Sequence, residues 1–390
     1  MSNDYEKSKN YPEVTLKELM EGMNMSDFRE KNEKMREQSI LAERNEKKRE
    51  KVKRCLQFLK WYTPIRVEKK LNEYVVGQPE LVKAVADFLY YHALRQLYPQ
   101  LPVRNLLIAG SSGSGKTEVF RRAKELFGYM INIRIVDGCR ITKEGWSGSQ
   151  KLEGLLSPDL DILVIDEADK LCTPSYTSGG GNVSKEIQSE FLKLMEGEYE
   201  VNERRKPSYI LDGVSVVFVG AFESIREKQK LESSRTFIGF GNVALESKKQ
   251  KQDITDDELI NFGVLPELLG RIAVKVVTND LSDEDYLQIL KNPHGRVETL
   301  LTVLTACGMS AEQVLSDEEI LDMIGKSKEN RTGFRWVSAQ VENQILETIR
   351  ENGVTIDEEV FEAMFSMFQE PDEEDDFFGM EDDFFGEEAS

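Results

Sequence analysis

Short runs of apolar, largely β-branched residues alternate with helical segments through the middle of the chain. Two helices are predicted, at Leu81–Tyr91 and Glu118–Phe127. Four apolar runs are predicted to be strands: Val103–Gly110, Ile131–Asp137, Asp161–Asp169 and Val214–Phe222. Buried strands separated by helices are typical of a parallel sheet that is covered on both faces. The pattern therefore predicts an α/β fold with a parallel-sheet large domain.

Both ends of the chain depart from this alternation. Beyond Ser282 the pattern becomes helical, over 283–292, 316–329 and 335–352, which indicates a smaller helical domain. Residues Phe28–Cys55 hold eleven Lys or Arg and six Glu without Gly or Pro, which favours a long exposed helix, either isolated in solvent or used as a docking arm. The predicted divisions are a charged helical extension (1–61), a large domain (62–282), a small helical domain (283–368) and an acidic, disordered tail (369–390).

Charge and composition narrow the function classes. The formal charge is −20, but residues 370–390 contain eleven acids and no base, so the remaining chain carries only −9. This balance opposes general nucleic-acid binding. The four cysteines are far apart and form no CxxC, so neither a zinc cluster nor a disulfide framework is indicated. Without an apolar run of about 18 residues or a targeting pattern, we expect a soluble, cytoplasmic protein.

A phosphate-binding motif follows the first predicted strand and opens a helix. Its sequence GSSGSGKT matches G-x4-G-K-[ST] and comprises Gly110, Ser111, Ser112, Gly113, Ser114, Gly115, Lys116 and Thr117. Its glycines allow backbone N–H groups to surround a β-phosphate, with help from the following helix dipole. Lys116 is expected to bridge the β- and γ-phosphates and Thr117 to bind Mg²⁺. The expected ligands are therefore ATP and Mg²⁺.

Two carboxylates end the third predicted strand, ILVIDEAD. Asp166 and Glu167 are expected at the carboxyl edge of the sheet, where ligands bind in such folds. Asp166 would hold Mg²⁺ through its water shell, and Glu167 would polarise the attacking water. Taken alone, Asp166 also suits a helix N-cap.

At this point the motifs resemble those of AAA+ ATPases, specifically the ClpX-type protein unfoldases, from about Tyr62 to Ile356. In YVVGQPELVK the resemblance implies that Val75 and Val76 flank adenine. In VLPELLGRI it makes Arg271 an arginine finger acting on the neighbouring subunit of a hexameric ring, and in TGFR it makes Arg335 the second sensor. For Arg271 a surface ion pair is the alternative. Near Val219–Ser224 no clear polar sensor is evident.

The same resemblance places substrate contacts in a central pore. GWSG (145–148) stands where the family has a gripping loop, so Trp146 would push on the polypeptide, although the family's usual tyrosine is replaced and Ser147 stands at a hydrophobic position. A docking or core role is the alternative for Trp146. A second pore loop is expected around Val201. The basic turn at 204–206 resembles an entrance collar, or is a solvated turn.

Partner contacts are expected in two further segments. FIGFG (237–241) stands where the family has a loop that docks into a ClpP-like peptidase, with Ile238, Gly239 and Phe240 as anchors; a loop tucked on the ring is the alternative. In the tail, DDFFG occurs twice and offers Phe377, Phe378, Phe384 and Phe385 to a basic-grooved protein, unless the tail only solubilises. Unlike ClpX, the sequence carries a charged helix in place of the zinc-binding module.

The resulting expectation is a hydrolase and chaperone that couples ATP hydrolysis to threading of protein substrates through a homo-hexamer. One alternative is a dedicated assembly or remodelling ATPase acting on one partner without proteolysis. The other, a nucleic-acid motor, is favoured only by the basic N-terminal segment and basic turn. The two histidines, His92 and His294, have no evident nucleophile beside them in the sequence, so packing or surface roles are expected.

Overall fold

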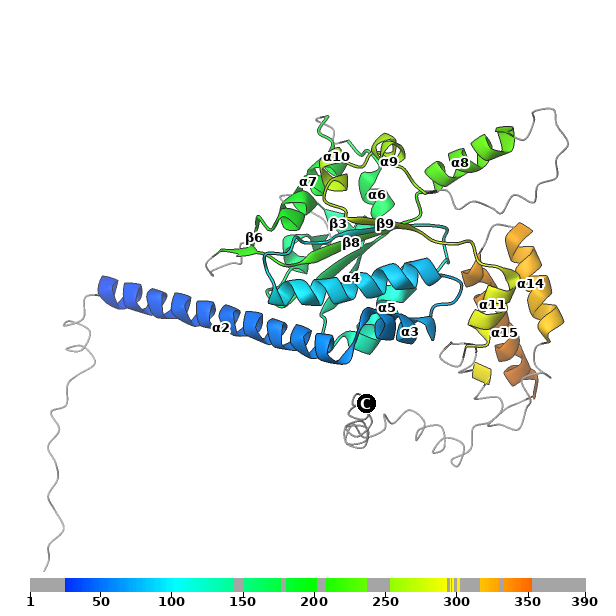
Figure 1. The fold of residues 1–390 in the computed structure, drawn as a ribbon, viewed down its shortest axis with the longest axis horizontal. Helices are drawn as coiled ribbons and strands as arrows, with labels where there is room; N and C mark the ends of the chain where they lie inside the picture. The colour runs from blue at the N-terminus through cyan, green and yellow to red at the C-terminus, as the bar shows by residue number, and fades with distance from the viewer. Residues whose placement is uncertain are drawn as a thin grey trace, which may run out of the picture.

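A five-stranded parallel sheet forms the centre of the large domain in the computed structural model (Figure 1). The structure describes residues 25–142, 150–176, 180–201, 208–236, 253–292, 316–329 and 333–352, with a few single positions between 295 and 301. The strand order of the five-stranded sheet is β2-β5-β8-β1-β9. The strands are β1 (Leu106–Ala109), β2 (Ile133–Asp137), β5 (Ile162–Asp166), β8 (Ser215–Gly220) and β9 (Val274–Val277). The predicted α/β fold is confirmed.

Helices cover both faces of this sheet. One face packs against α3 (Pro64–Asn72), α4 (Pro79–Leu97) and α5 (Glu118–Phe127), and the other against α6 (Ala168–Cys172), α7 (Val183–Glu196) and α10 (Pro266–Leu269). Alternate residues of β1 serve the two faces, because successive strand side chains point in opposite directions. Leu106 and Ile108 belong to the apolar cluster on the side of α3, α4 and α5, whereas Leu107 and Ala109 belong to the cluster on the side of α6, α7 and α10.

Shorter elements connect these layers. Two 3-10 helices lie at Gly138–Arg140 and Glu153–Leu155, and the remaining elements of the large domain are β3 (Ile141–Thr142), β4 (Gln150–Lys151), β6 (Tyr199–Val201), β7 (Tyr209–Leu211), α8 (Glu223–Thr236) and α9 (Asp256–Phe262). The fifth strand, β9, pairs with β1 at the sheet edge and was not among the predicted strands. Three of its four residues are only partly buried, and Lys275 interrupts the apolar run by which the other strands were predicted.

The long N-terminal helix α2 (Met25–Trp61) is present, but only one of its halves has the solvent exposure that the sequence predicts. Its second half lies against α4 (Figure 1). Cys55 and Phe58 are fully buried in the apolar cluster of the large domain. Lys51 is also buried, and its ammonium donates a hydrogen bond of 2.7 Å to the carbonyl of Leu160. The expectation of a helix isolated in solvent is therefore wrong for this half, and a boundary at residue 62 divides one packed unit.

In the small unit that follows the sheet, the described residues form three helices. They are α11 (Asp283–Leu290), α14 (Asp317–Glu329) and α15 (Phe334–Asn352), in agreement with the predicted helical segments. Their common core includes Tyr286, Ile324, Val337 and Val341. Among the described residues, the helices are too short or too polar for any of them to cross a bilayer.

Candidate nucleotide site

The loop between β1 and α5 has the backbone that the phosphate motif predicts. Gly113 and Gly115 have φ values of +78° and +88°, a left-handed conformation that strains other residues. A Cβ on Gly110 would lie 1.7 Å from the Thr278 hydroxyl oxygen, so only glycine fits there. Glycine is thus required at three positions for backbone conformation or space, which agrees with a loop built to present its N–H groups.

Lys116 lies buried within this loop. Its ammonium donates to the carbonyl oxygens of Gly110 at 2.9 Å and Ser111 at 2.5 Å. Burial lowers the pKa of Lys116 to about 8; the charge of Asp166 opposes this shift, and that of Arg226 adds to it. A cation held only by loop carbonyls is well placed to exchange them for phosphate oxygens, which bear a full charge.

The two predicted carboxylates stand together at the carboxyl end of β5. Glu167 has φ +54°, and its backbone N–H donates to the Asp166 carboxylate at 3.0 Å. A left-handed conformation costs a non-glycine residue about 1–2 kcal/mol, and such strain clusters at functional sites. The strain sets the direction in which the Glu167 side chain leaves the strand.

A thiol from the neighbouring strand contacts Glu167. Cys139 follows β2, which pairs with β5, and its Sγ donates to Glu167 Oε2 at 3.1 Å. This hydrogen bond is the main cause that raises the pKa of Cys139 to about 11. The contact between Cys139 and Glu167 was not predicted from the sequence. The available signal was the position of Cys139, just beyond the end of the predicted strand Ile131–Asp137.

The residues present fit a magnesium nucleotide. Thr117 and Asp166 offer the hydroxyl and carboxylate oxygens that Mg²⁺ prefers, and both come from elements that meet at the carboxyl edge of the sheet. When bound, the ion neutralises charge on the phosphates. In this chain, Lys116 would bind the phosphates and Glu167 would orient and polarise water.

The predicted base-contacting segment lies beside the phosphate loop. Val75 is buried, and its Cγ1 is 3.8 Å from where a Cβ on Gly115 would stand. Val76 is partly buried. The Gln78 side chain exchanges two hydrogen bonds of 2.8 Å with the backbone of Asn279. These contacts place the segment next to the loop, and the adenine contacts of Val75 and Val76 stay a prediction.

The linker between β9 and α11 contacts the site at three consecutive residues. Thr278 donates to the Ser114 hydroxyl at 2.8 Å. The Asn279 amide donates to the Gly77 carbonyl at 3.1 Å. The Asp280 carboxylate accepts from the Ser111 hydroxyl at 3.2 Å. Sequence reasoning did not find this linker, because its partners lie more than 160 residues away.

The two predicted arginines occupy different surroundings. Arg335 lies in the first turn of α15, where Phe334 N is 3.5 Å from a Cβ position on Gly113, so this turn faces the phosphate loop. Arg271 follows α10, and its Nε and Nη2 donate to Glu196 Oε1 at 3.2 and 2.7 Å. Within this subunit Arg271 thus makes a half-exposed ion pair; its action on a neighbour stays a prediction.

Most predicted pore and docking residues lie outside the described residues. These are Trp146, Ile238, Gly239, Phe240, Phe377, Phe378, Phe384 and Phe385. Val201 is described and is 1% exposed, because β6 alternation turns it and Tyr199 into the core while Glu200 faces solvent. A substrate contact at this place would fall to residues 202–207, which also lie outside the described residues.

A serine, a histidine and an aspartate meet at the opposite edge of the sheet. His92 Nδ1 lies 2.9 Å from the Ser215 hydroxyl, and Nε2 lies 3.2 Å from Asp161 Oδ1. All three side chains are buried, with residue exposures of 1%, 1% and 0%. No substrate reaches them, so this arrangement is structural, as expected for His92.

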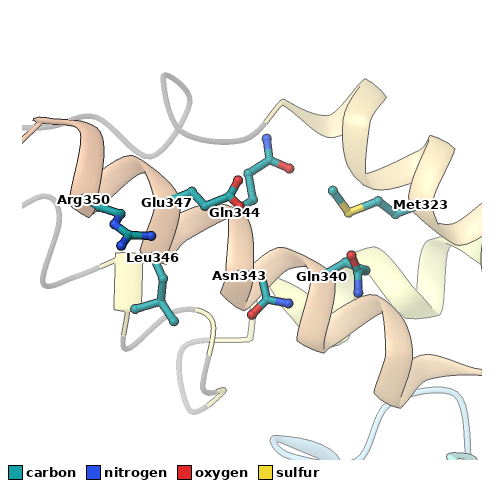
Figure 2. A pocket seen from close by; sticks show the side chains of 7 residues that line it. All are labelled: Met323, Gln340, Asn343, Gln344, Leu346, Glu347 and Arg350. Carbon is teal, nitrogen blue, oxygen red and sulfur yellow. The ribbon is translucent and has the colours of Figure 1, made fainter.

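A groove of about 470 Å³ lies on the small unit, away from the phosphate loop (Figure 2). Met323 of α14 faces a row of mainly polar side chains on α15 across it. None of the predicted nucleotide-site residues lines this groove.

Comparison with known proteins agrees with this site. Residues 106–240 match the family described as ATPase family associated with various cellular activities (AAA). The ATP-dependent Clp protease ATP-binding subunit ClpX of Treponema denticola is 31% identical over 270 residues, which cover 60% of this chain and 64% of that relative. The subunit of the same name from Azotobacter vinelandii is 25% identical over 330 residues, covering 74% of this chain and 73% of that relative.

The first of these relatives is matched over slightly less than two thirds of its length. The matched family region begins at β1 and includes the phosphate loop and the β5 carboxylates. Sheet order, loop geometry and sequence similarity therefore agree that the chain carries an AAA+ ATPase domain of α/β P-loop fold that resembles those of the ClpX subunits.

Proposed function

We propose that the protein hydrolyses ATP with Mg²⁺ and uses the energy to unfold protein substrates, acting as a hexameric ring. The observation that carries this proposal is the phosphate loop beside the β5 carboxylates, with Lys116 held by the carbonyls of Gly110 and Ser111. The similarity to ClpX subunits supports protein as the proposed substrate class.

The chemistry follows from the placement of these groups. Lys116 and the loop N–H groups bind the β- and γ-phosphates, and Thr117 with Asp166 holds the metal ion. Glu167 accepts a hydrogen bond from the attacking water and directs it at the γ-phosphorus. Arg335 stabilises the charge that develops on the γ-phosphate, and Arg271 does so from the neighbouring subunit.

Mechanical work requires that nucleotide state moves the small unit relative to the sheet. Linker residues Thr278, Asn279 and Asp280 contact the site directly, so a change at the phosphate loop reaches α11 through the chain itself. Threading past Trp146 and delivery to a ClpP-like peptidase through Ile238, Gly239 and Phe240 extend the proposal to segments outside the described residues.

The test combines ATP turnover with unfolding of a tagged fluorescent protein by the purified full chain. We expect turnover that rises with unfolded protein and ATP-dependent loss of fluorescence, both abolished by Lys116→Ala. Turnover without unfolding, stimulated by a single partner, would favour the dedicated remodelling ATPase. Stimulation by DNA or RNA and not by protein would contradict the proposal.

A further inference from the structure

An additional arginine, Arg226 of helix α8, is connected to the phosphate loop through Asp280. Its guanidinium Nη2 donates to Asp280 Oδ1 at 2.8 Å, and the side chain is only 15% exposed. The same Asp280 oxygen accepts from the hydroxyl of Ser111, the second residue of the loop, at 3.2 Å. One carboxylate oxygen therefore joins Arg226 to the loop.

Lys116 meets the loop at the same residue. Its ammonium donates to the Ser111 carbonyl, so Ser111 is contacted by Lys116 directly and by Arg226 through Asp280. The charges of Arg226 and Arg335 both contribute to lowering the pKa of Lys116. Three cations from three elements thus converge on one loop. The carboxylates of Asp166 and Asp169 offset part of this positive charge, and a polyanion bound between the cations would offset more of it.

The present partner of Arg226 is a weak one. Asp280 is 60% exposed, and ion pairs with exposed carboxylates contribute little to stability because water screens them. A phosphate offers two charged oxygens to the planar guanidinium and makes stronger, bidentate hydrogen bonds. Exchange of Asp280 for phosphate is therefore favourable once the phosphate lies at the loop.

We infer that Arg226 binds the terminal phosphate of ATP in its own subunit and that Asp280 holds its guanidinium beside the loop until the triphosphate arrives. This inference rests on the proposed ATPase function and adds a residue to it. Its consequence is discrimination: a group that reaches only the third phosphate strengthens ATP binding and leaves ADP binding unchanged. Release of Asp280 also removes one of the contacts between the loop and the linker to α11, while the Thr278 contact with Ser114 remains.

The test measures the affinities of the full chain for a non-hydrolysable ATP analogue and for ADP, both with Mg²⁺, by calorimetry. For Arg226→Gln we expect the analogue to bind about tenfold or more weakly and ADP to stay within about twofold. Arg226→Lys keeps the charge without the fork and should give an intermediate loss. Lys228→Gln removes an equal charge from the exposed face of α8 and should change neither affinity.

Asp280→Asn is the last variant, because it weakens the interaction of residue 280 with Arg226 and leaves the Arg226 side chain in place. The analogue should then bind as tightly as to the wild type, or more tightly. Equal weakening of both nucleotides by Arg226→Gln, or no weakening of either, would overturn the inference, as would a loss in Asp280→Asn as large as that in Arg226→Gln. If the wild type binds neither nucleotide, the proposed function itself fails.

Discussion

The two ends of strand β5 carry aspartates in opposite situations. Asp161, just before the strand, is fully buried and contacts Lys51, Arg54 and His92 at 3.2–3.6 Å. Its second oxygen accepts from the backbone N–H of Asn132 at 2.8 Å. Asp166, at the other end, is only partly buried.

The residue after Asp166 sharpens this contrast. Glu167 is exposed and has a strained backbone, whereas Asp161 is enclosed together with Lys51 and His92, which contact it. Enclosed polar groups with several partners stabilise a fold, while accessible groups in strained positions can act on a ligand. The difference assigns stability to the amino end of β5 and chemistry to its carboxyl end.

The largest effect on stability is expected from Asp161→Asn. Burial alone would raise the pKa of Asp161, but the His92 hydrogen bond and the Lys51 charge hold it below its usual range. The substitution leaves the buried Lys51 ammonium and the partly buried Arg54 guanidinium without their counter-charge, so the free energy of unfolding should fall by about 3–5 kcal/mol.

Urea denaturation followed by circular dichroism measures this loss. Asp87→Asn, at an exposed position of α4, is the matched control and should leave the midpoint unchanged. Below the midpoint, ATP-analogue affinity of Asp161→Asn should stay within about twofold. A large loss of affinity with intact stability would reverse the assignment of the two strand ends.

A smaller effect is expected at Cys139, which reports on the carboxyl end. The Glu167 hydrogen bond and charge raise the thiol pKa to about 11, so Glu167→Gln should lower that pKa and expose more thiolate. Iodoacetamide should then alkylate Cys139 roughly tenfold faster at pH 8. Because residue 307 lies outside the described residues, the measurement is made in a Cys307→Ser background. An unchanged alkylation rate would contradict the contact between the Cys139 thiol and Glu167.

The smallest effect is expected in the pH dependence of stability, through His92 at the amino end of β5. Burial lowers the pKa of His92, although Asp161 opposes the shift, so the ring is neutral in the folded protein. The unfolded chain takes up a proton near pH 6.5 that the folded chain does not, and stability should therefore fall as pH drops below 6.5, by at most about 1.4 kcal/mol per unit. Asp161, Lys51, Arg95 and Ser215 face the ring.

The control for this prediction is His92→Gln. This variant should be less stable at pH 7 but lose less stability between pH 7 and 5 than the wild type, as measured by urea midpoints. Parallel pH profiles for the two proteins would show that His92 does not titrate on unfolding.

Local patterns predicted much of this structure. The phosphate motif identified its loop, apolar runs identified four strands, and the segment Glu118–Phe127 is a helix with those bounds. The carboxylates at 166 and 167 were predicted because a buried strand ended there. In each case the information lies within about ten consecutive residues.

What the sequence did not reveal depends on contacts between distant residues. The burial of Lys51 under the sheet, the linker contacts of Asp280 and the approach of Arg226 join segments that are 54 to 169 positions apart. A charged residue is predicted to be solvent-exposed unless its partner is known. The many charges of α2 therefore gave no sign that its second half packs against the large domain. Strand β9 was missed because an edge strand with a lysine lacks a continuous apolar run.

ATP turnover of Glu167→Gln shows whether the carboxyl end of β5 carries the chemistry, provided that ATP-analogue affinity and the urea midpoint are measured on the same preparation. We expect turnover to fall about 10²-fold or more, since general base catalysis contributes about 10²–10⁴. Analogue affinity should stay within about threefold and the midpoint should not fall. Turnover equal to that of the wild type, or a loss that accompanies unfolding, would contradict the assignment of chemistry to the carboxyl end of β5.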